Sequence, residues 1–134
     1  MTDQELIDFF LKELVSEITY KFEREIDFII LFGSASRGDF KKGVSDIDLV
    51  VQLKTTQKRE EILNYSTNKF WDLNKKYNTE FEKVISTASS NTNIETLLKN
   101  IEKKTHLYVP IFVFPPGWIN WQKGKINGIG EKKS

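Results

Sequence analysis

Apolar residues recur at two different periods along this chain, and each period predicts a different kind of element. Through residues 3–24 they return every three to four positions, which gives one apolar face and predicts a long helix. Thr2 and Glu5 have the spacing of a capping box at its start. Residues 26–32 form an almost unbroken apolar run, which is typical of a buried central strand. In residues 46–53 apolar and polar positions alternate, which predicts a second strand.

The second half of the chain continues the alternation of helix and strand. Residues 60–76 have the period of a second long helix, and residues 79–86 and 108–114 are predicted to be short strands. A capping box that begins at Thr92 predicts a further helix between those two strands. Pro110 has no N–H to donate to a neighbouring strand, so the last strand should lie at an edge of the sheet. Helices that alternate with strands predict the α/β class, with the helices packed on one sheet.

Composition narrows the chemistry that this single domain can carry. Its 134 residues include no cysteine and one histidine, which excludes a disulfide framework, a thiol nucleophile and zinc sites built from Cys or several His. Any metal site must therefore use carboxylates, which favour a hard ion such as Mg²⁺. The 20 Lys and Arg nearly cancel the 19 Asp and Glu, so no overall field attracts a nucleic acid, and a nucleic-acid partner is not expected.

Two further features concern location and organisation. The first ten residues are acidic and helical in period, unlike a signal peptide, and no apolar run is long enough to span a membrane. We therefore expect a cytoplasmic protein without a membrane partner. The composition changes after Phe114, where two prolines and a glycine precede an aromatic, lysine-rich stretch. We interpret residues 1–114 as the domain and residues 115–134 as an aromatic, basic C-terminal extension, which would fit the edge of a missing segment.

Two aspartates on the second predicted strand carry the strongest chemical signal. Asp46 and Asp48 are two positions apart, so their side chains leave the same face of the strand. Like charges this close repel each other, and no Lys or Arg lies in residues 43–53 to compensate them. A divalent cation would compensate both, and two carboxylates can hold two metal ions. The alternative is a solvated edge strand, against which the apolar neighbours Ile47 and Leu49 argue.

A turn follows the first predicted strand at Gly33 and Ser34. Such a turn can direct backbone N–H groups and a hydroxyl toward phosphate oxygens, although the same pair often marks only a turn. The spacing from Gly33 to Gly38 suggests a Walker A loop, but Asp39 stands where that motif requires Lys, which excludes it. Arg37 fits either a phosphate contact or an exposed ion pair with Asp39.

Together these two stretches resemble a known family. Residues 32–38 read F-G-S-A-S-R-G and residues 45–49 read S-D-I-D-L. This pattern resembles the nucleotidyltransferase superfamily that includes DNA polymerase beta, and most closely its minimal nucleotidyltransferase domains, which are often antitoxin partners of HEPN proteins. The resemblance implies an α/β (α+β) fold with a mixed sheet of about four strands. It also implies transfer of a nucleoside monophosphate, AMP from ATP or from another nucleoside triphosphate, to a hydroxyl with release of pyrophosphate.

The resemblance assigns nucleotide contacts to the glycine turn. Gly33 and Ser34 would contact the triphosphate, together with Arg37. Asp46 and Asp48 would hold two Mg²⁺ ions, with Mn²⁺ as a substitute.

A third carboxylate on the next strand would complete the metal site and accept the proton of the attacking hydroxyl. Glu80 and Glu82 both qualify, because they share a face of the predicted strand. Glu82 is predicted to be this catalytic and metal-binding residue, because it lies closer to the apolar end of the strand.

Two classes of function stay open. The first is an enzyme whose acceptor hydroxyl belongs to a partner protein, a small molecule or an RNA end. The second is a nucleotide-binding interaction module, an antitoxin-like partner of a HEPN protein with weak or no catalysis. The short chain favours the second class, because few residues after position 114 remain to form a second domain that binds the acceptor. Either class is compatible with an oligomer.

Overall fold

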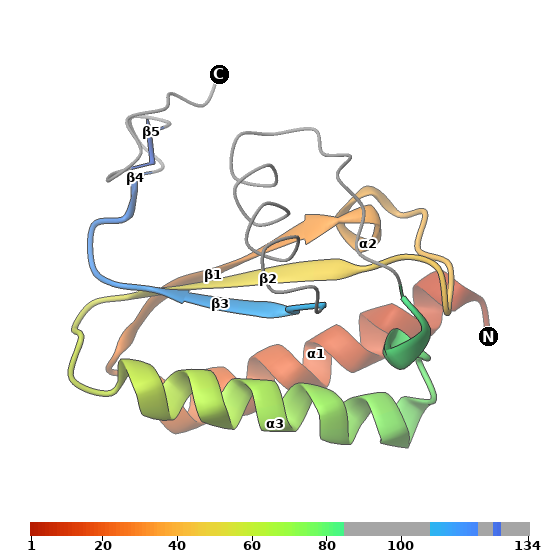
Figure 1. Ribbon diagram of the computed structural model, residues 1–134, viewed down its shortest axis with the longest axis horizontal. Coiled ribbons are helices and arrows are strands. Elements are labelled where there is room, and N and C mark those ends of the chain that lie inside the picture. The colour runs from red at the N-terminus through yellow and green to blue at the C-terminus, as the bar shows by residue number, and fades with distance from the viewer. Residues whose placement is uncertain (85–107, 121–124, 127–134) are drawn as a thin grey trace.

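The computed structural model describes residues 1–84, 108–120 and 125–126 (Figure 1). The described elements, in chain order, are α1 (Asp3–Phe22), β1 (Ile26–Gly33), α2 (Ser34–Arg37), β2 (Ile47–Leu53), α3 (Arg59–Tyr77), the 3₁₀ helix η1 (Phe81–Lys83), β3 (Ile111–Phe114), β4 (Ile119–Asn120) and β5 (Lys125–Ile126). The two long helices and the first two strands are confirmed almost to the residue. The short helix α2 occupies the start of a stretch whose composition predicts a polar turn.

The first helix begins and packs as its sequence predicts. The N–H of Glu5 donates to the Thr2 hydroxyl at 3.1 Å, and the N–H of Thr2 donates to the Glu5 carboxylate at 2.9 Å, so the capping box is complete. The apolar face of α1 is fully buried, with Ile7, Phe10, Leu14, Ile18 and Phe22 at steps of three or four residues. Burial of this face holds α1 against the rest of the domain.

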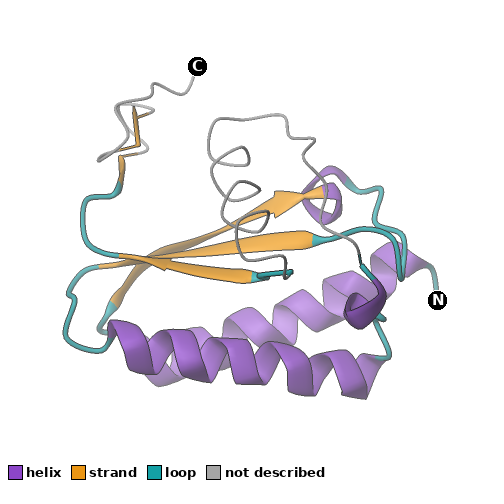
Figure 2. Ribbon diagram, viewed as in Figure 1, coloured by secondary structure: helices purple, strands orange, loops and turns teal. Residues whose placement is uncertain are grey.

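The described strands form a three-stranded mixed sheet in the order β1-β2-β3. Within this described sheet β2 is the central strand and β1 an edge strand whose middle residues are only half-buried, so the prediction of a buried central strand at residues 26–32 is wrong. β1 is antiparallel to β2, and β2 is parallel to β3. Figures 1 and 2 show α1 and α3 side by side beneath one face of this sheet. Their contact includes an edge-to-face pair between Phe10 of α1 and Phe70 of α3, with ring centroids 5.3 Å apart. The arrangement is the expected α+β class.

The two faces of the sheet have different neighbours. The face toward α1 and α3 carries Leu49, Val51, Ile111 and Val113, which belong to the main core. The opposite face carries a second apolar cluster made of Phe32, Val50, Phe112 and Phe114, against which Trp118 packs. Asp48 pairs with Phe32 in the β1–β2 register and Gln52 with Phe114 in the β2–β3 register, so both polar residues lie on this second face.

Gln52 connects the sheet to the chain that follows it. Its side chain is 1% exposed, and its amide donates to the carbonyl oxygen of Pro115. Trp118 stacks obliquely on Phe114 with ring centroids 5.4 Å apart. These contacts hold residues 115–118 against the end of β3.

The strand predicted over residues 79–86 is wrong for its described part, residues 79–84, which contain η1 instead. Glu80 has φ 60° and ψ 34°, a left-handed conformation that interrupts an extended chain. Phe81 then turns inward and is 1% exposed, in contact with the rings of Phe10 and Phe70. Burial of this ring outweighs the alternating pattern that suggested a strand. The rest of that predicted strand and the helix predicted after Thr92 lie outside the described residues.

The expectation for Pro110 is confirmed within the described part of the chain. β3 begins one residue later, at Ile111, and it pairs there with β2 alone. The carbonyl oxygen of Pro110 accepts a hydrogen bond from the N–H of Leu49 at 2.8 Å. Pro110 therefore stands at the beginning of an edge strand, where its missing N–H is tolerated. None of the described helices combines the length and apolarity that crossing a membrane would need.

Candidate functional site

The turn after β1 is built around Gly33 and closed by its own hydrogen bonds. Gly33 has φ 102° and ψ −175°, a conformation that residues with a side chain rarely adopt. The Ser36 hydroxyl donates to the carbonyl oxygen of Gly33 at 2.7 Å, and the N–H of Asp39 donates to the carbonyl oxygen of Ser34 at 3.2 Å. The turn is therefore an ordered structure that reverses the chain directly after the buried end of β1, Phe32 and Gly33.

The Ser34 hydroxyl is the unusual group of this turn. Its oxygen is buried, and it has no hydrogen-bond partner within the described part of the chain. A buried hydroxyl without a partner is energetically unfavourable, and a bound water, ion or ligand is one way in which such a group is satisfied. The Ser34 hydroxyl can therefore complete its hydrogen bonding with a ligand bound at the turn.

The structure brings this turn directly against the first of the two aspartates. A Cβ on Gly33 would lie 3.1 Å from the carbonyl oxygen of Asp46. Asp46 is half-buried and immediately precedes β2, which begins at Ile47, opposite Gly33 in the register. The Gly33–Ser34 turn and the start of β2 thus form one end of the β1–β2 pair.

Asp48 lies one step farther along β2, on the face of the sheet that carries the second apolar cluster. Its side chain is 1% exposed and sits opposite Phe32, beside Val50. The apolar side chains around Asp48 lower the local permittivity, which strengthens the attraction between its carboxylate and any nearby cation. Asp46 and Asp48 share strand parity, as the alternation along the sequence predicts.

Tyr108, which the sequence did not single out, binds the start of β2 on the side away from β1. The Tyr108 hydroxyl accepts a hydrogen bond from the N–H of Ile47 at 2.8 Å and donates to the carbonyl oxygen of the same residue. The Tyr108 ring stacks on Phe81 with centroids 6.0 Å apart. A tyrosine two residues before Pro110 was the only available signal, and it does not by itself identify the partner.

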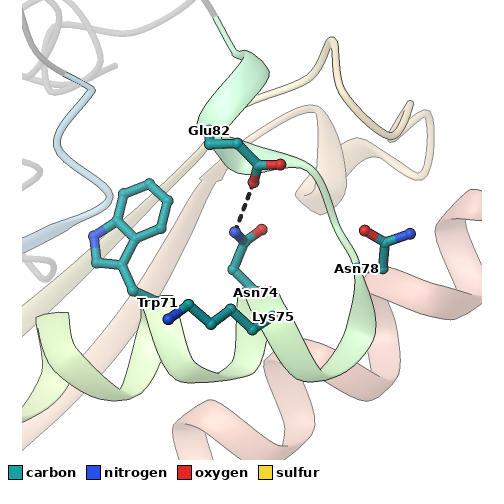
Figure 3. A pocket seen from close by; sticks show the side chains of 5 residues that line it. All are labelled: Trp71, Asn74, Lys75, Asn78 and Glu82. Atoms are coloured by element: carbon teal, nitrogen blue, oxygen red, sulfur yellow. Dashed lines mark hydrogen bonds between the residues drawn. The ribbon is translucent and has the colours of Figure 1, made fainter.

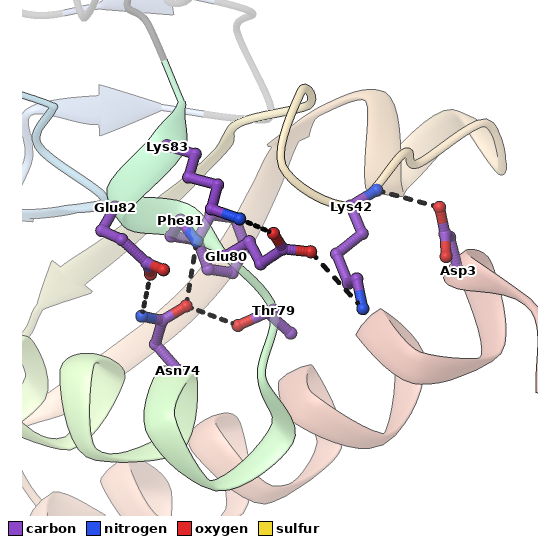
Figure 4. Close-up of polar contacts among 8 residues, drawn as sticks. All are labelled: Asp3, Lys42, Asn74, Thr79, Glu80, Phe81, Glu82 and Lys83. Carbon is purple, nitrogen blue, oxygen red and sulfur yellow. Dashed lines mark hydrogen bonds and ion pairs between the residues drawn. The ribbon is translucent and has the colours of Figure 1, made fainter.

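The two glutamates considered as a third carboxylate have partners of their own (Figure 4). Glu82 is exposed and accepts a hydrogen bond from the Asn74 amide at 2.8 Å, which lowers the pKa of its carboxyl group. Glu80 forms ion pairs with Lys83 and with Lys42, and the hydrogen bond from Lys83 is the main cause of its lowered pKa. Among the described residues, no three acidic or histidine side chains form a group able to hold a metal ion.

A pocket of about 510 Å³ lies beside Glu82 (Figure 3). Its described lining comes from α3, from the residue that follows it and from η1: Trp71, Asn74, Lys75, Asn78 and Glu82. The pocket combines an indole, an ammonium group and a carboxylate. It adjoins the Asn74–Glu82 hydrogen bond and not the Gly33–Ser34 turn.

The remaining predicted contact, Arg37, is the exposed last residue of α2. The structure thus gathers Gly33, Ser34, Asp46 and Asp48 at one end of the sheet, whereas Glu82 belongs to a separate hydrogen-bond network on η1. The gathered groups are two carboxylates, which suit a hard cation such as Mg²⁺, and a hydroxyl, which can donate a hydrogen bond to a phosphate oxygen.

Comparison with known proteins agrees with this geometry. A family model, described as a nucleotidyltransferase domain, matches residues 11–114, which include the Gly33–Ser34 turn, both aspartates and all three strands of the main sheet. Searches of the curated proteins and of the solved structures gave no significant match. Because the family model covers more than half of the chain, this protein belongs to the nucleotidyltransferase domain family and carries the transferase fold on which nucleoside monophosphates are transferred.

Proposed function

We propose that this chain transfers AMP from ATP to a hydroxyl group, with Asp46 and Asp48 as the ligands of the divalent metal. The observation that carries the proposal is the contact between the Gly33 turn and the Asp46 backbone. It brings the turn that carries the buried Ser34 hydroxyl, which has no partner among the described residues, to the start of β2, where Asp46 immediately precedes the strand and Asp48 lies within it. A triphosphate needs such neighbouring groups, one for its phosphate oxygens and one for its metal ions.

Each residue of this site has a defined task in the proposed reaction. The Ser34 hydroxyl and the backbone of the turn hold the phosphate groups, and the exposed guanidinium of Arg37 supplies a positive charge beside them. Asp46 and Asp48 hold the metal. Two Mg²⁺ ions, or Mn²⁺, would supply the charge that stabilises the attacking and leaving oxygens.

The balance of the step is simple. The acceptor oxygen forms a bond to the α-phosphorus, and the bond from the α-phosphorus to the bridging oxygen of pyrophosphate breaks. The acceptor hydroxyl loses its proton to a base. We propose Glu82 as the third carboxylate, which would complete the metal site and accept this proton; the hydrogen bond from Asn74 lowers the pKa of its carboxyl group and so makes it a weaker proton acceptor. An ionised carboxylate with a low pKa is a better metal ligand than proton acceptor.

A second candidate has its own supporting observation. Glu80 and Glu82 are each bound to other residues, and the described residues contain no three-carboxylate group. A minimal nucleotidyltransferase domain that binds a nucleotide and acts as the antitoxin-like partner of a HEPN protein would tolerate that arrangement. Catalysis would then be weak or absent, whereas nucleotide binding would persist.

The two candidates are separated by measuring binding and transfer in the same preparations. Calorimetry with ATP and Mg²⁺ measures binding, and ATP labelled at the α-phosphate reports transfer to proteins in a lysate of the source organism. We expect both in the wild type, and loss of transfer by at least about 100-fold in Asp46→Asn and Asp48→Asn. Asp27→Asn, an exposed aspartate of β1, is the matched control and should behave as the wild type.

The outcomes assign the function. Binding without transfer in the wild type would favour the antitoxin-like module, and neither binding nor transfer would overturn both candidates. Transfer that persists in both aspartate variants would overturn the metal assignment. Glu82→Gln and Glu80→Gln are compared in the same assays, and loss of transfer in Glu80→Gln alone would show that Glu82 is the wrong choice.

A further inference from the structure

The backbone hydrogen bonds between β2 and β3 end next to the two aspartates. The N–H of Leu49 donates to the carbonyl oxygen of Pro110, the last backbone rung that the described residues provide on this side. Residues two apart in a strand direct their backbone polar groups to the same side, so the N–H and C=O of Ile47 also point toward β3. Pro110 has no N–H to offer, and a further rung requires another donor and another acceptor.

The side chain of Tyr108 supplies both this donor and this acceptor. The Tyr108 hydroxyl accepts from the N–H of Ile47 at 2.8 Å and donates to its carbonyl oxygen. A hydroxyl can do this because it is both donor and acceptor. The Tyr108 ring is itself fixed by aromatic neighbours, with Phe81 stacked at 6.0 Å and Phe70 edge-on at 6.3 Å between ring centroids.

Ile47 is the residue between Asp46 and Asp48, and both of its backbone polar groups are bound by Tyr108. On one side it pairs in the register with Gly33, and on the other it is bound by Tyr108. The directions in which two carboxylates at i and i+2 leave the chain depend on the backbone dihedral angles of the residue between them. A group that fixes the Ile47 backbone therefore fixes the separation of the two carboxylates.

We propose that Tyr108 is a positioning residue for nucleotidyl transfer, which holds the Ile47 backbone so that Asp46 and Asp48 keep the separation that their metal ions require. The inference rests on the proposed function, because it needs the aspartates to be the metal ligands. Tyr108 acts through Ile47 and has no contact with the reacting atoms in this role. Residues that orient metal ligands in this way typically change metal affinity about 10- to 100-fold when they are replaced.

The test compares Tyr108→Phe with Tyr77→Phe. Tyr108→Phe keeps the aromatic ring and removes the hydroxyl. Tyr77→Phe is the matched control, since the Tyr77 hydroxyl also hydrogen-bonds within the protein, to Glu13 at 2.7 Å, but away from β2. Five quantities are measured in each variant: the amide exchange rate of Ile47 by NMR, the affinity for Mn²⁺ in the presence of ATP by electron paramagnetic resonance, kcat, KM for ATP, and the melting temperature.

In Tyr108→Phe we expect faster exchange at Ile47, Mn²⁺ affinity about tenfold weaker and kcat about tenfold lower, with KM for ATP within about twofold of the wild type. Tyr77→Phe should change none of these. A residue with only a structural role would lower the melting temperature and leave the Mn²⁺ affinity and kcat at the wild-type values. That result would overturn the inference.

Failure of the inference and failure of the proposed function give different results. If the wild type binds no Mn²⁺ with ATP present, the metal assignment fails whatever Tyr108 does. If Tyr108→Phe does not fold, the wild type still tests whether the metal lies beside Ile47 and Tyr108, as the inference requires. Bound Mn²⁺ should broaden the NMR signals of Ile47 and Tyr108 more strongly than those of Tyr20, which lies near the C-terminal end of α1. Equal broadening at Tyr108 and Tyr20 would contradict the proposed placement.

Discussion

Gly33 lies so close to the carbonyl oxygen of Asp46 that a Cβ at position 33 would stand 3.1 Å from that oxygen. The contact joins the end of β1 to the start of β2, and the φ of 102° at Gly33 is a second reason for the glycine. Two separate costs therefore oppose any side chain at this position: backbone strain, and a tight contact that requires the Asp46 backbone to move by a few tenths of an ångström.

Gly33→Ala is expected to lower the free energy of unfolding by about 3 kcal/mol and to reduce nucleotidyl transfer together with it. Gly38→Ala is the matched control, because Gly38 has φ 83° but no atom lies within 4 Å of the place that a Cβ would take there. It should cost only the strain of a left-handed residue, about 1 kcal/mol. Urea denaturation of both variants measures the difference, and equal losses would show that the Asp46 contact contributes nothing.

Loss of the hydroxyl should have different effects at two serines of the same turn: lower stability at Ser36 and weaker ATP binding at Ser34. The Ser36 hydroxyl donates to Gly33, so Ser36→Ala should cost about 1 kcal/mol of folding free energy. The Ser34 hydroxyl is buried without a partner in the described residues, so Ser34→Ala should leave stability within about 0.5 kcal/mol of the wild type. Ser34→Ala should instead weaken ATP binding about tenfold, measured by calorimetry. Unchanged ATP affinity in Ser34→Ala would remove that hydroxyl from the nucleotide site.

Much of this arrangement can be predicted from the sequence because it depends on local order. The capping box of Thr2 and Glu5, the apolar face of α1 and the period of two around Asp46 and Asp48 are all properties of neighbouring residues. The same locality explains why the sequence predicts β1 and β2 almost to the residue. Their antiparallel pairing, which places Gly33 opposite Ile47, is a contact between strands that the pattern of neighbouring residues does not predict.

The features that sequence analysis missed depend on contacts between distant residues. Residues 79–84 alternate like a strand, but burial of Phe81 against Phe10 and the left-handed Glu80 turn them into η1. The hydrogen bonds from Tyr108 to Ile47 join residues 61 positions apart, so no local pattern indicates them. Parity along a strand could not decide between Glu80 and Glu82, because residues two apart share a face.

The contact between α1 and α3 near Glu13 should make stability depend on pH. Glu13 accepts hydrogen bonds from the Lys76 ammonium at 2.8 Å and from the Tyr77 hydroxyl at 2.7 Å, and both lower the pKa of its carboxyl group below 4.5. A carboxyl group whose pKa is lower in the folded state contributes stability above its unfolded pKa and loses it as the pH falls. We therefore expect this contribution to be present at pH 6 and to decline below about pH 4.5, toward the lower folded pKa.

Glu13→Gln should lower the melting temperature at pH 6. The difference in melting temperature between the wild type and the variant should become smaller as the pH falls toward 3. Asp72→Asn, at an exposed position of α3, is the control and should leave that pH dependence nearly unchanged. Thermal unfolding followed by circular dichroism between pH 3 and pH 7 measures both. A melting-temperature difference between wild type and Glu13→Gln that is constant over this range would contradict the assigned cause.

Asn74 joins α3 to η1, and its two amide atoms require different partners. Its oxygen accepts from the Thr79 hydroxyl at 2.7 Å and from the N–H of Phe81 at 3.0 Å, and its nitrogen donates to Glu82. Asn74→Ala leaves the buried N–H of Phe81 without its acceptor and should cost about 2 to 3 kcal/mol. Urea denaturation measures this loss.

Asn74→Asp tests the charge at Glu82 separately from the acceptor role of the side chain. It keeps an acceptor for Thr79 and Phe81 but replaces the hydrogen bond to Glu82 with a contact between two carboxylates, so it should destabilise the fold at pH 7. Adding Glu82→Gln should restore stability, because the Gln amide can donate to the new carboxylate. Denaturation of the wild type, both single variants and the double variant gives the coupling free energy between the two positions. A coupling of zero would show that Asn74 does not hold Glu82, and Glu82 would then be free to turn toward Asp46 and Asp48 without breaking a stabilising contact.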